Sequence, residues 1–154
     1  MRVDRFEPGG QPLWTRTLTV PDAATTTCTA IVRTVADTTI LAGQVTRSPI
    51  LAAIDADGEV EWSAEVDMGA GSAGPTIAAL ALAPSGEIIA VGSVHHTNDG
   101  AGIEFANPTG LAALDGNALL VSGYIGAPDV DAFLLRLANN GMPVWAKSYA
   151  GVTE

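Results

Sequence analysis

The 154-residue sequence has little of several features that stabilise proteins or attract nucleic acids. Its single cysteine, Cys28, excludes a disulfide within the chain, and we expect this side chain to be a small buried apolar group. No apolar run reaches the roughly 18 residues of a membrane-spanning helix. Only 7 basic residues stand against 17 acidic ones, and the net charge of −10 argues against nucleic acids and anionic membranes as partners.

Apolar residues are plentiful by comparison. Hydrophobic residues make up 47% of the chain and charged residues 16%, a balance that excludes intrinsic disorder and allows one domain with a core. The first residues, 1–6, are strand-like and are followed by no apolar segment of a secretory signal. The last residues, 150–154, read as a loop. We therefore expect the chain to be a piece of a longer protein.

Three segments share a glycine that is followed four residues later by a tryptophan. The three pairs are Gly10 and Trp14, Gly58 and Trp62, and Gly141 and Trp145. Each segment is typical of a β-hairpin with the glycine in its turn. Trp62 follows Trp14 by 48 residues, whereas Trp145 follows Trp62 by 83, close to two repeats of about 40–45 residues. One tryptophan is therefore missing where the second full repeat should end. We interpret residues 101–110 as the surviving first strand of that hairpin, with its second strand deleted or degenerate.

A second kind of hairpin alternates with the first. It has an apolar strand, a polar turn and an apolar strand that ends at Gly43, Gly92 or Gly123. The runs 88–91 and 118–121 are continuously apolar, which predicts strands covered on both faces. Residues 59–66 alternate instead, with Val60, Trp62, Ala64 and Val66 on one face, which predicts a half-exposed outer strand. We interpret the Ala-rich run 77–83 as a strand, because Pro84 leaves too little room for a helix.

Four antiparallel strands per unit of this length predict an all-β, β-propeller-type array of four-stranded blades. We assign residues 1–20 to a half blade, 29–66 to a blade, 77–110 to a degenerate blade and 111–149 to a further blade. The single domain of residues 1–154 then has about three and a half blades. Closed propellers use about 4–8 blades, so the array is either incomplete or completed by another copy through its open blade edges.

The segment from Asp131 to Leu137, together with Trp145 to Tyr149, carries a family resemblance. Its Asp-Ala-Phe-Leu-x-Arg-Leu run and its Trp-x-Lys-x-Tyr run are similar to bacterial β-propeller repeats of the SBBP-like kind. The resemblance implies an exported protein, extracellular or periplasmic, that binds a protein or carbohydrate partner at one propeller face. Quinoprotein dehydrogenases are also propellers with a regular tryptophan in each blade. In both, the tryptophans pack between neighbouring blades, and we expect this structural role for Trp14, Trp62 and Trp145.

Two clusters could carry chemistry. The segment 55–59 has the alternating carboxylates of a calcium loop, but the equivalent turns lack them, which favours a plain turn with glycine. His95 and His96 are neighbours in the sequence, and adjacent strand residues point to opposite faces, so they would chelate one metal poorly. We predict neither a metal site nor a cofactor. The best candidate ligand-binding residues lie in loops expected on one face, namely His95, His96, Asp99, Asp67, Asp129 and Asp131.

No catalytic constellation is visible, and we predict no catalytic residue. The leading hypothesis is a non-enzymatic binding or scaffold module of an exported bacterial protein. The alternative is part of a propeller enzyme, such as a quinoprotein-like oxidoreductase, whose active site needs loops outside this chain. A self-assembling half propeller is the third hypothesis.

Overall fold

A computed structural model of the chain describes residues 1–19, 25–46, 48–66, 72–96, 107–113, 119–124 and 130–149. Every regular element among them is a β-strand, and every strand pair is antiparallel, which confirms the expected all-β class. The strands are β1 Arg2–Phe6, β2 Pro12–Thr17, β3 Thr26–Arg33, β4 Thr39–Val45, β5 Ser48–Ile54, β6 Val60–Glu65, β7 Ser72–Leu82, β8 Ile88–His96, β9 Asn107–Ala113, β10 Leu119–Tyr124, β11 Val130–Leu137 and β12 Pro143–Tyr149.

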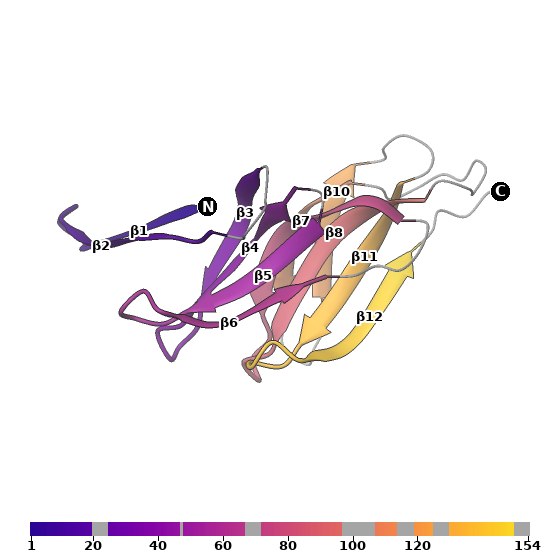
Figure 1. The fold of residues 1–154 in the computed structure, drawn as a ribbon. Coiled ribbons are helices and arrows are strands. Elements are labelled where there is room, and N and C mark those ends of the chain that lie inside the picture. The colour runs from indigo at the N-terminus through magenta and orange to yellow at the C-terminus, as the bar shows by residue number, and fades with distance from the viewer. Residues whose placement is uncertain are drawn as a thin grey trace.

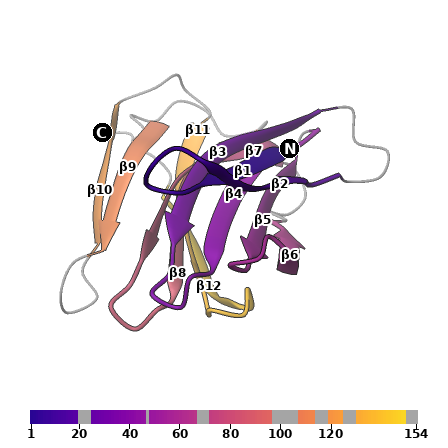
Figure 2. The ribbon, with the colours of Figure 1, turned by 90° about the vertical axis from the view of Figure 1, so that its left-hand side faces the viewer.

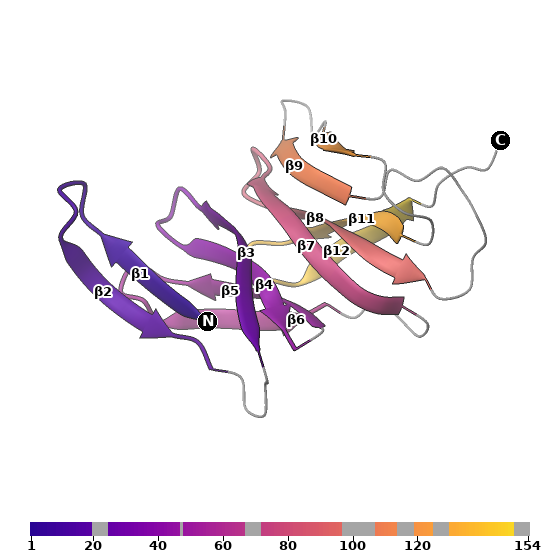
Figure 3. The same cartoon turned by 90° about the horizontal axis from the view of Figure 1, so that it is seen from above.

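The strands form four sheets that are stacked as layers (Figure 1). The β1–β2 hairpin lies against a four-stranded sheet of order β3-β4-β5-β6. This sheet packs on a second four-stranded sheet of order β12-β11-β8-β7. The β9–β10 hairpin lies on the far side of that second sheet, next to β7 and β8, as Figures 2 and 3 show.

The main core lies between the two four-stranded sheets. Side chains from β4 and β5 meet side chains from β7, β8 and β11 there, with Phe133 and Ile88 fully buried. On its other face, the first sheet packs Leu41 and Ile54 against Val3 of β1. Strands β4 and β5 are therefore covered on both faces. In β8, the continuous apolar run 88–91 is buried throughout, as its sequence predicts.

The outer strand β6 also follows its sequence pattern. It lies at the edge of its sheet, with Trp62 and Ala64 half-buried and Glu61 and Glu65 exposed. Val60, by contrast, is 48% exposed, because it lies where the strand begins after the turn. The run 77–83 is almost entirely strand, as expected, and belongs to β7 and its following turn.

The pairing of the last strands differs from the expected grouping of residues 111–149 into one blade. Strand β11 pairs with β8, while β9 and β10 pair only with each other among the described residues. The contact between Phe133 and Gly92 gives a physical reason. These two residues are register partners, and a Cβ on Gly92 would lie 2.6 Å from the Phe133 ring, so the glycine makes room for the buried phenyl group. Strands β11 and β12 thus complete the sheet begun by β7 and β8.

Gly43, Gly92 and Gly123 lie within their strands and do not end them as expected, because β4 extends to Val45, β8 to His96 and β10 to Tyr124. Each of these glycines lies close to an irregularity in the strand pairing. At Gly43, a Cβ would lie 2.0 Å from the carbonyl oxygen of Thr27, and at Gly92 it would lie 2.0 Å from that of Thr76. The register of the neighbouring strand shifts close to both points, and β10 shifts against β9 at Gly123. A side chain at either of the first two positions would collide with the backbone.

Cys28 is exposed, so the expectation that it is buried was wrong. It lies in β3, which is an edge strand of its sheet. An edge strand leaves room for a small side chain at the surface, and the sequence around Cys28 does not distinguish an edge from the centre of a sheet.

Candidate functional site

Two of the three tryptophans reach the next hairpin of the same kind. The Trp14 side chain comes from β2 and lies against the turn between β5 and β6. Its indole Nε1 donates to the carbonyl oxygen of Ala56 at 2.9 Å. Its ring covers Gly58, where an added Cβ would lie 3.0 Å from Cδ2 of the indole.

Trp62 repeats this arrangement one layer further along the stack. Its Nε1 donates to the carbonyl oxygen of Asn139 at 3.2 Å, in the turn between β11 and β12. Its ring covers Gly141, where an added Cβ would lie 2.7 Å from two ring carbons. Gly58 and Gly141 have φ of 86° and 80°, a conformation that glycine adopts at little cost. Glycine thus provides both the turn conformation and the space for the indole.

The three hairpins that bear a tryptophan share one geometry. In each turn, one backbone N–H donates to the carbonyl four residues ahead, and the glycine N–H donates back to the carbonyl three residues earlier. Each tryptophan also holds the same place in the register, opposite Arg5, Ala53 or Arg136, just before a bulge. The common spacing between glycine and tryptophan therefore places an acceptor turn and an indole on every such hairpin.

Trp145 differs from the other two tryptophans. Its ring is half-buried, and its neighbour in the structure is the Lys147 ammonium, 5.8 Å from the ring centroid. At no glycine of the described turns is the Trp145 ring among the nearest neighbours of a built Cβ. At the opposite end of the stack, Gly10 is exposed, and among the described residues nothing lies within 4 Å of a Cβ built on it.

Arginines surround the Trp14 contact, and sequence reasoning missed their role. Arg16 Nε donates to the carbonyl of Gly58 at 3.0 Å, and Nη2 pairs with Glu59 at 2.6 Å. Arg5 donates to the carbonyl of Ala56 and pairs with Asp37 at 3.1 Å. Three of the five acceptors of these two arginines are main-chain oxygens, on Ala56, Asp57 and Gly58, and every residue type provides such an oxygen. The only usable signal was that Arg16 lies two residues beyond a tryptophan.

The carboxylate of Asp55 is occupied by its own turn. Its Oδ1 accepts from the backbone N–H of Asp57 at 2.9 Å and of Glu59 at 2.8 Å. This arrangement is an Asx turn, in which the side chain caps the backbone. Among the residues that the structure describes, no group of three or more His, Cys, Asp and Glu side chains gathers closely enough to hold a metal ion.

The predicted ligand-binding residues lie partly within the described structure. His95 and His96 end β8, and Asp131 is the second residue of β11. Val130 is the register partner of His95, and Asp131 is that of Val94, so the backbone brings these positions to one end of one sheet. Asp67, Asp99 and Asp129 lie outside the described residues.

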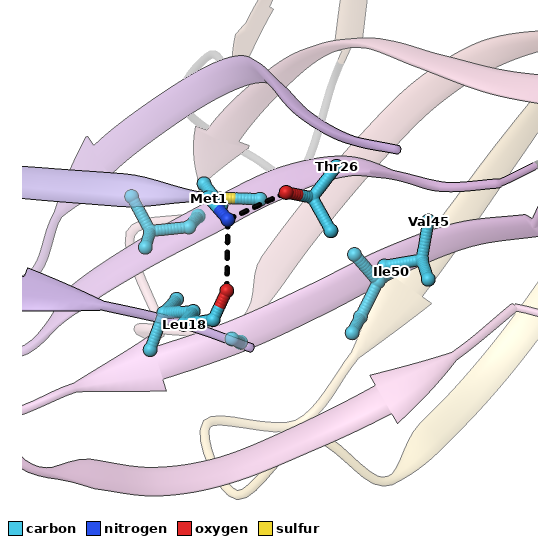
Figure 4. Close-up of a pocket in the computed structure, with 7 residues that line it drawn as sticks. Met1, Leu18, Thr26, Val45 and Ile50 are labelled. Carbon is cyan, nitrogen blue, oxygen red and sulfur yellow. Dashed lines mark hydrogen bonds between the residues drawn. The ribbon is translucent and has the colours of Figure 1, made fainter. Parts of the chain in front are cut away.

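Two hollows lie where the β1–β2 hairpin meets the first four-stranded sheet. The smaller one, of about 20 Å³, is lined by apolar groups, and the Met1 ammonium beside it donates to Leu18 at 2.8 Å and to the Thr26 hydroxyl at 2.5 Å (Figure 4). That volume holds about one water molecule. The larger one is a surface groove of about 280 Å³, whose lining has no acid, base or imidazole. Its residues are Thr17, Leu18, Thr19, Ile50, Ala52, Val60 and Ser63.

Comparison with known proteins assigns no family to the chain. No family model matches the chain, and no curated protein matches it. Among solved structures it is similar to a protein of unknown function from Bacteroides caccae, with 13% sequence identity and a TM-score of 0.48. The match covers 94% of this chain and 52% of that one, so the chain spans about half the length of the similar protein. Within the described residues, no helix is long and apolar enough to cross a membrane.

Proposed function

We propose that the chain is a non-enzymatic binding or scaffold module of an exported bacterial protein, built from propeller-like blades. The observation that carries the proposal is the repeated contact between an indole and the glycine turn of the next hairpin. This contact fastens consecutive layers at one end of the sheets, where the hairpin turns lie. The opposite end, where β8 ends and β11 begins, is left for longer connections, and connections on a rigid scaffold are where proteins usually bind their partners.

The proposed binding end includes His95, His96 and Asp131, for either a protein or a carbohydrate partner. The backbone register brings these positions to one end of one sheet, and imidazole and carboxylate are residue types that offer both donors and acceptors, as recognition of hydroxyl groups or of a peptide backbone needs. The groove beneath the β1–β2 hairpin lies elsewhere, and its lining has no titratable group.

Screening the protein against arrays of neutral oligosaccharides and of peptides tests this proposal. We expect binders whose affinity falls at least about tenfold in a variant that carries both His95→Ala and Asp131→Ala. The matched control is Ser85→Ala, in the β7–β8 turn at the opposite end of the same sheet, and it should bind like the parent protein. Binding that is unaffected by the double variant, or turnover of a quinone substrate with calcium present, would contradict the proposal.

A further inference from the structure

Two of the four sheets in the described chain have only two strands, and they lie at opposite ends of the stack. The β1–β2 hairpin has the glycine turn and the tryptophan of an outer pair, like β5–β6. The β9–β10 hairpin has Gly123 in its second strand, as the inner pair β3–β4 has Gly43 in its second strand. Each sheet thus has the half that the other lacks.

We propose that two copies of this chain associate head to tail, with β1–β2 of one copy completing the sheet of β9–β10 in the other. Strand β10 would pair antiparallel with β1 of the second copy, giving the order β9-β10-β1-β2. Within the described chain, neither β10 nor β1 has a second neighbour in its sheet. A free strand edge presents unpaired N–H and C=O groups and pairs readily with another chain. This inference stands independently of the proposed partner binding.

The two complete sheets fix the register of the proposed pairing. Gly43 of β4 faces Ile50 of β5, and Gly92 of β8 faces Phe133 of β11. Ile50 lies three residues before Ala53, the residue opposite Trp62. In the same way, Phe133 lies three residues before Arg136, the residue opposite Trp145. In β1 the position opposite the tryptophan is Arg5, so Gly123 should face Arg2 of the second copy, and Val121 should face Asp4.

The same arrangement supplies the indole that Gly10 lacks. In the existing layers, Trp14 covers Gly58 and Trp62 covers Gly141. Trp145 holds the same register position on β12, and it would cover Gly10 of the second copy. Gly10 has φ of 84°, within a few degrees of the two covered glycines, and its turn makes the same two hydrogen bonds as theirs. Gly58 is buried under its indole, whereas Gly10 is exposed.

Charge also favours this contact. Arg16, two residues after Trp14, donates to the turn that Trp14 covers. The residue in the same place after Trp145 is Lys147, and the turn that contains Gly10 begins at Glu7. A lysine on the indole side would thus approach a turn with one carboxylate, Glu7, in the place that Asp55 has in the β5–β6 turn, while Gln11 has the place of Glu59, the partner of Arg16. Because the two surfaces differ, the contact is heterologous and produces either a closed ring or a filament.

Light scattering after size exclusion, over a range of protein concentrations, tests the association first. We expect particles of two or more 15.7 kDa copies, whose mass increases with concentration. Trp145→Ala should weaken association at least about tenfold, as loss of a central tryptophan does in other interfaces. Val144→Ala, at the neighbouring exposed position, is the control and should leave association unchanged. A monomer at every concentration would overturn the proposal.

Mixing two defective variants distinguishes head-to-tail contact from a symmetric one. Trp145→Ala retains its Gly10 turn, and Gly10→Val, which fills that turn, retains Trp145. Each alone should be monomeric, while an equimolar mixture should form a dimer that does not grow. Glu7→Lys and Lys147→Glu form a second pair of variants, at charged groups outside the core. Each substitution alone should weaken association. The chain that carries both should associate like the parent protein. Failure of both the mixture and the charge reversal would overturn the proposal.

Cysteine cross-linking tests the register in a Cys28→Ser background. A copy with Val121→Cys should form a disulfide with a copy that carries Asp4→Cys. The control partner carries Phe6→Cys, two positions along β1 and exposed, and it should cross-link at least about tenfold more slowly because the thiols cannot approach. Equal rates for the two partners would contradict the proposed strand pairing.

Discussion

The indole Nε1 of Trp62 donates to the carbonyl oxygen of Asn139, 77 residues further along the chain and in another sheet. The ring of the same tryptophan lies on Gly141 of that turn. Trp14 makes the equivalent contact with Ala56 and Gly58. These two contacts join three successive layers at their turn ends, and the stability of the stack should depend on them.

Removing an indole should destabilise the protein according to what it covers. Full burial of a tryptophan predicts a loss of about 3–5 kcal/mol for substitution by alanine. Because Trp14 and Trp62 are only half-buried, we expect roughly 2 kcal/mol for Trp62→Ala and a similar loss for Trp14→Ala. Trp145→Ala, measured where the protein is monomeric, should cost less than about 1 kcal/mol. Urea unfolding followed by circular dichroism measures all three, and equal losses would contradict this ranking.

The turn glycines allow backbone conformation to be separated from indole contact. Gly141 and Gly86 have φ of 80° and 86°, but only Gly141 lies under an indole; nothing lies within 4 Å of a Cβ built on Gly86. Gly86→Ala should therefore lower the free energy of unfolding by about 1 kcal/mol, the cost of a positive φ for alanine. Gly141→Ala should lower the free energy of unfolding by at least about 1 kcal/mol more than Gly86→Ala, because its Cβ displaces the Trp62 ring. In a Trp62→Ala background the two substitutions should cost the same.

The ion pair between Glu87 and Arg136 makes stability depend on acid pH. The hydrogen bond from Arg136 lowers the pKa of the Glu87 carboxyl below its usual value, and the Ser85 hydroxyl adds to the effect. A carboxyl whose pKa is lower in the folded state stabilises the fold above its unfolded pKa, and this stabilisation is lost as the pH falls through its folded pKa. Glu87→Gln should therefore be less stable than the parent at pH 7, and the difference should disappear at acid pH.

Urea unfolding of both proteins between pH 7 and pH 2 checks this dependence. Glu61→Gln is the control, since Glu61 lies on the exposed face of β6. It should follow the parent protein across the range. A difference between Glu87→Gln and the parent that persists undiminished at the lowest pH would show that charge is not the source of the effect.

The exposed thiol of Cys28 should react in the folded protein. Neighbouring groups partly desolvate the sulfur and raise the pKa of the thiol, so we expect labelling by a maleimide that is complete in the native state and accelerates as the pH rises. Mass spectrometry after labelling with and without denaturant measures this. A thiol that reacts only in denaturant would contradict the exposure of Cys28 on β3.

The sequence predicted local structure well, because periodicity reports which faces of a strand are covered. The alternation around Trp62 predicted an outer strand, and the apolar run 88–91 predicted a strand buried on both faces; the structure has both. Periodicity does not report which strand lies next to which. An apolar run such as β11 could pair with either β8 or β10. Pairing with β8 depends on the packing of Phe133 on Gly92, which is visible only in three dimensions.

The candidate sites show the same limit. The constant spacing from glycine to tryptophan was visible, but its meaning was not, because the contact joins residues of different hairpins. The oxygens that accept from Trp14 and Trp62 belong to the main chain of Ala56 and Asn139, and a main-chain acceptor leaves no mark in the sequence. The arginines at 5 and 16 were missed for the same reason.

Nuclear Overhauser effects between indole and glycine protons test the docking of tryptophans on turns most directly. With the three indoles assigned from Trp→Phe variants, at a concentration where the protein is monomeric, we expect cross-peaks from Trp62 to the α-protons of Gly141 and from Trp14 to those of Gly58. Trp145 should show none to any turn glycine. Cross-peaks from Trp62 to Gly58 of its own hairpin, or none from Trp14 and Trp62 to the next turn, would contradict the account.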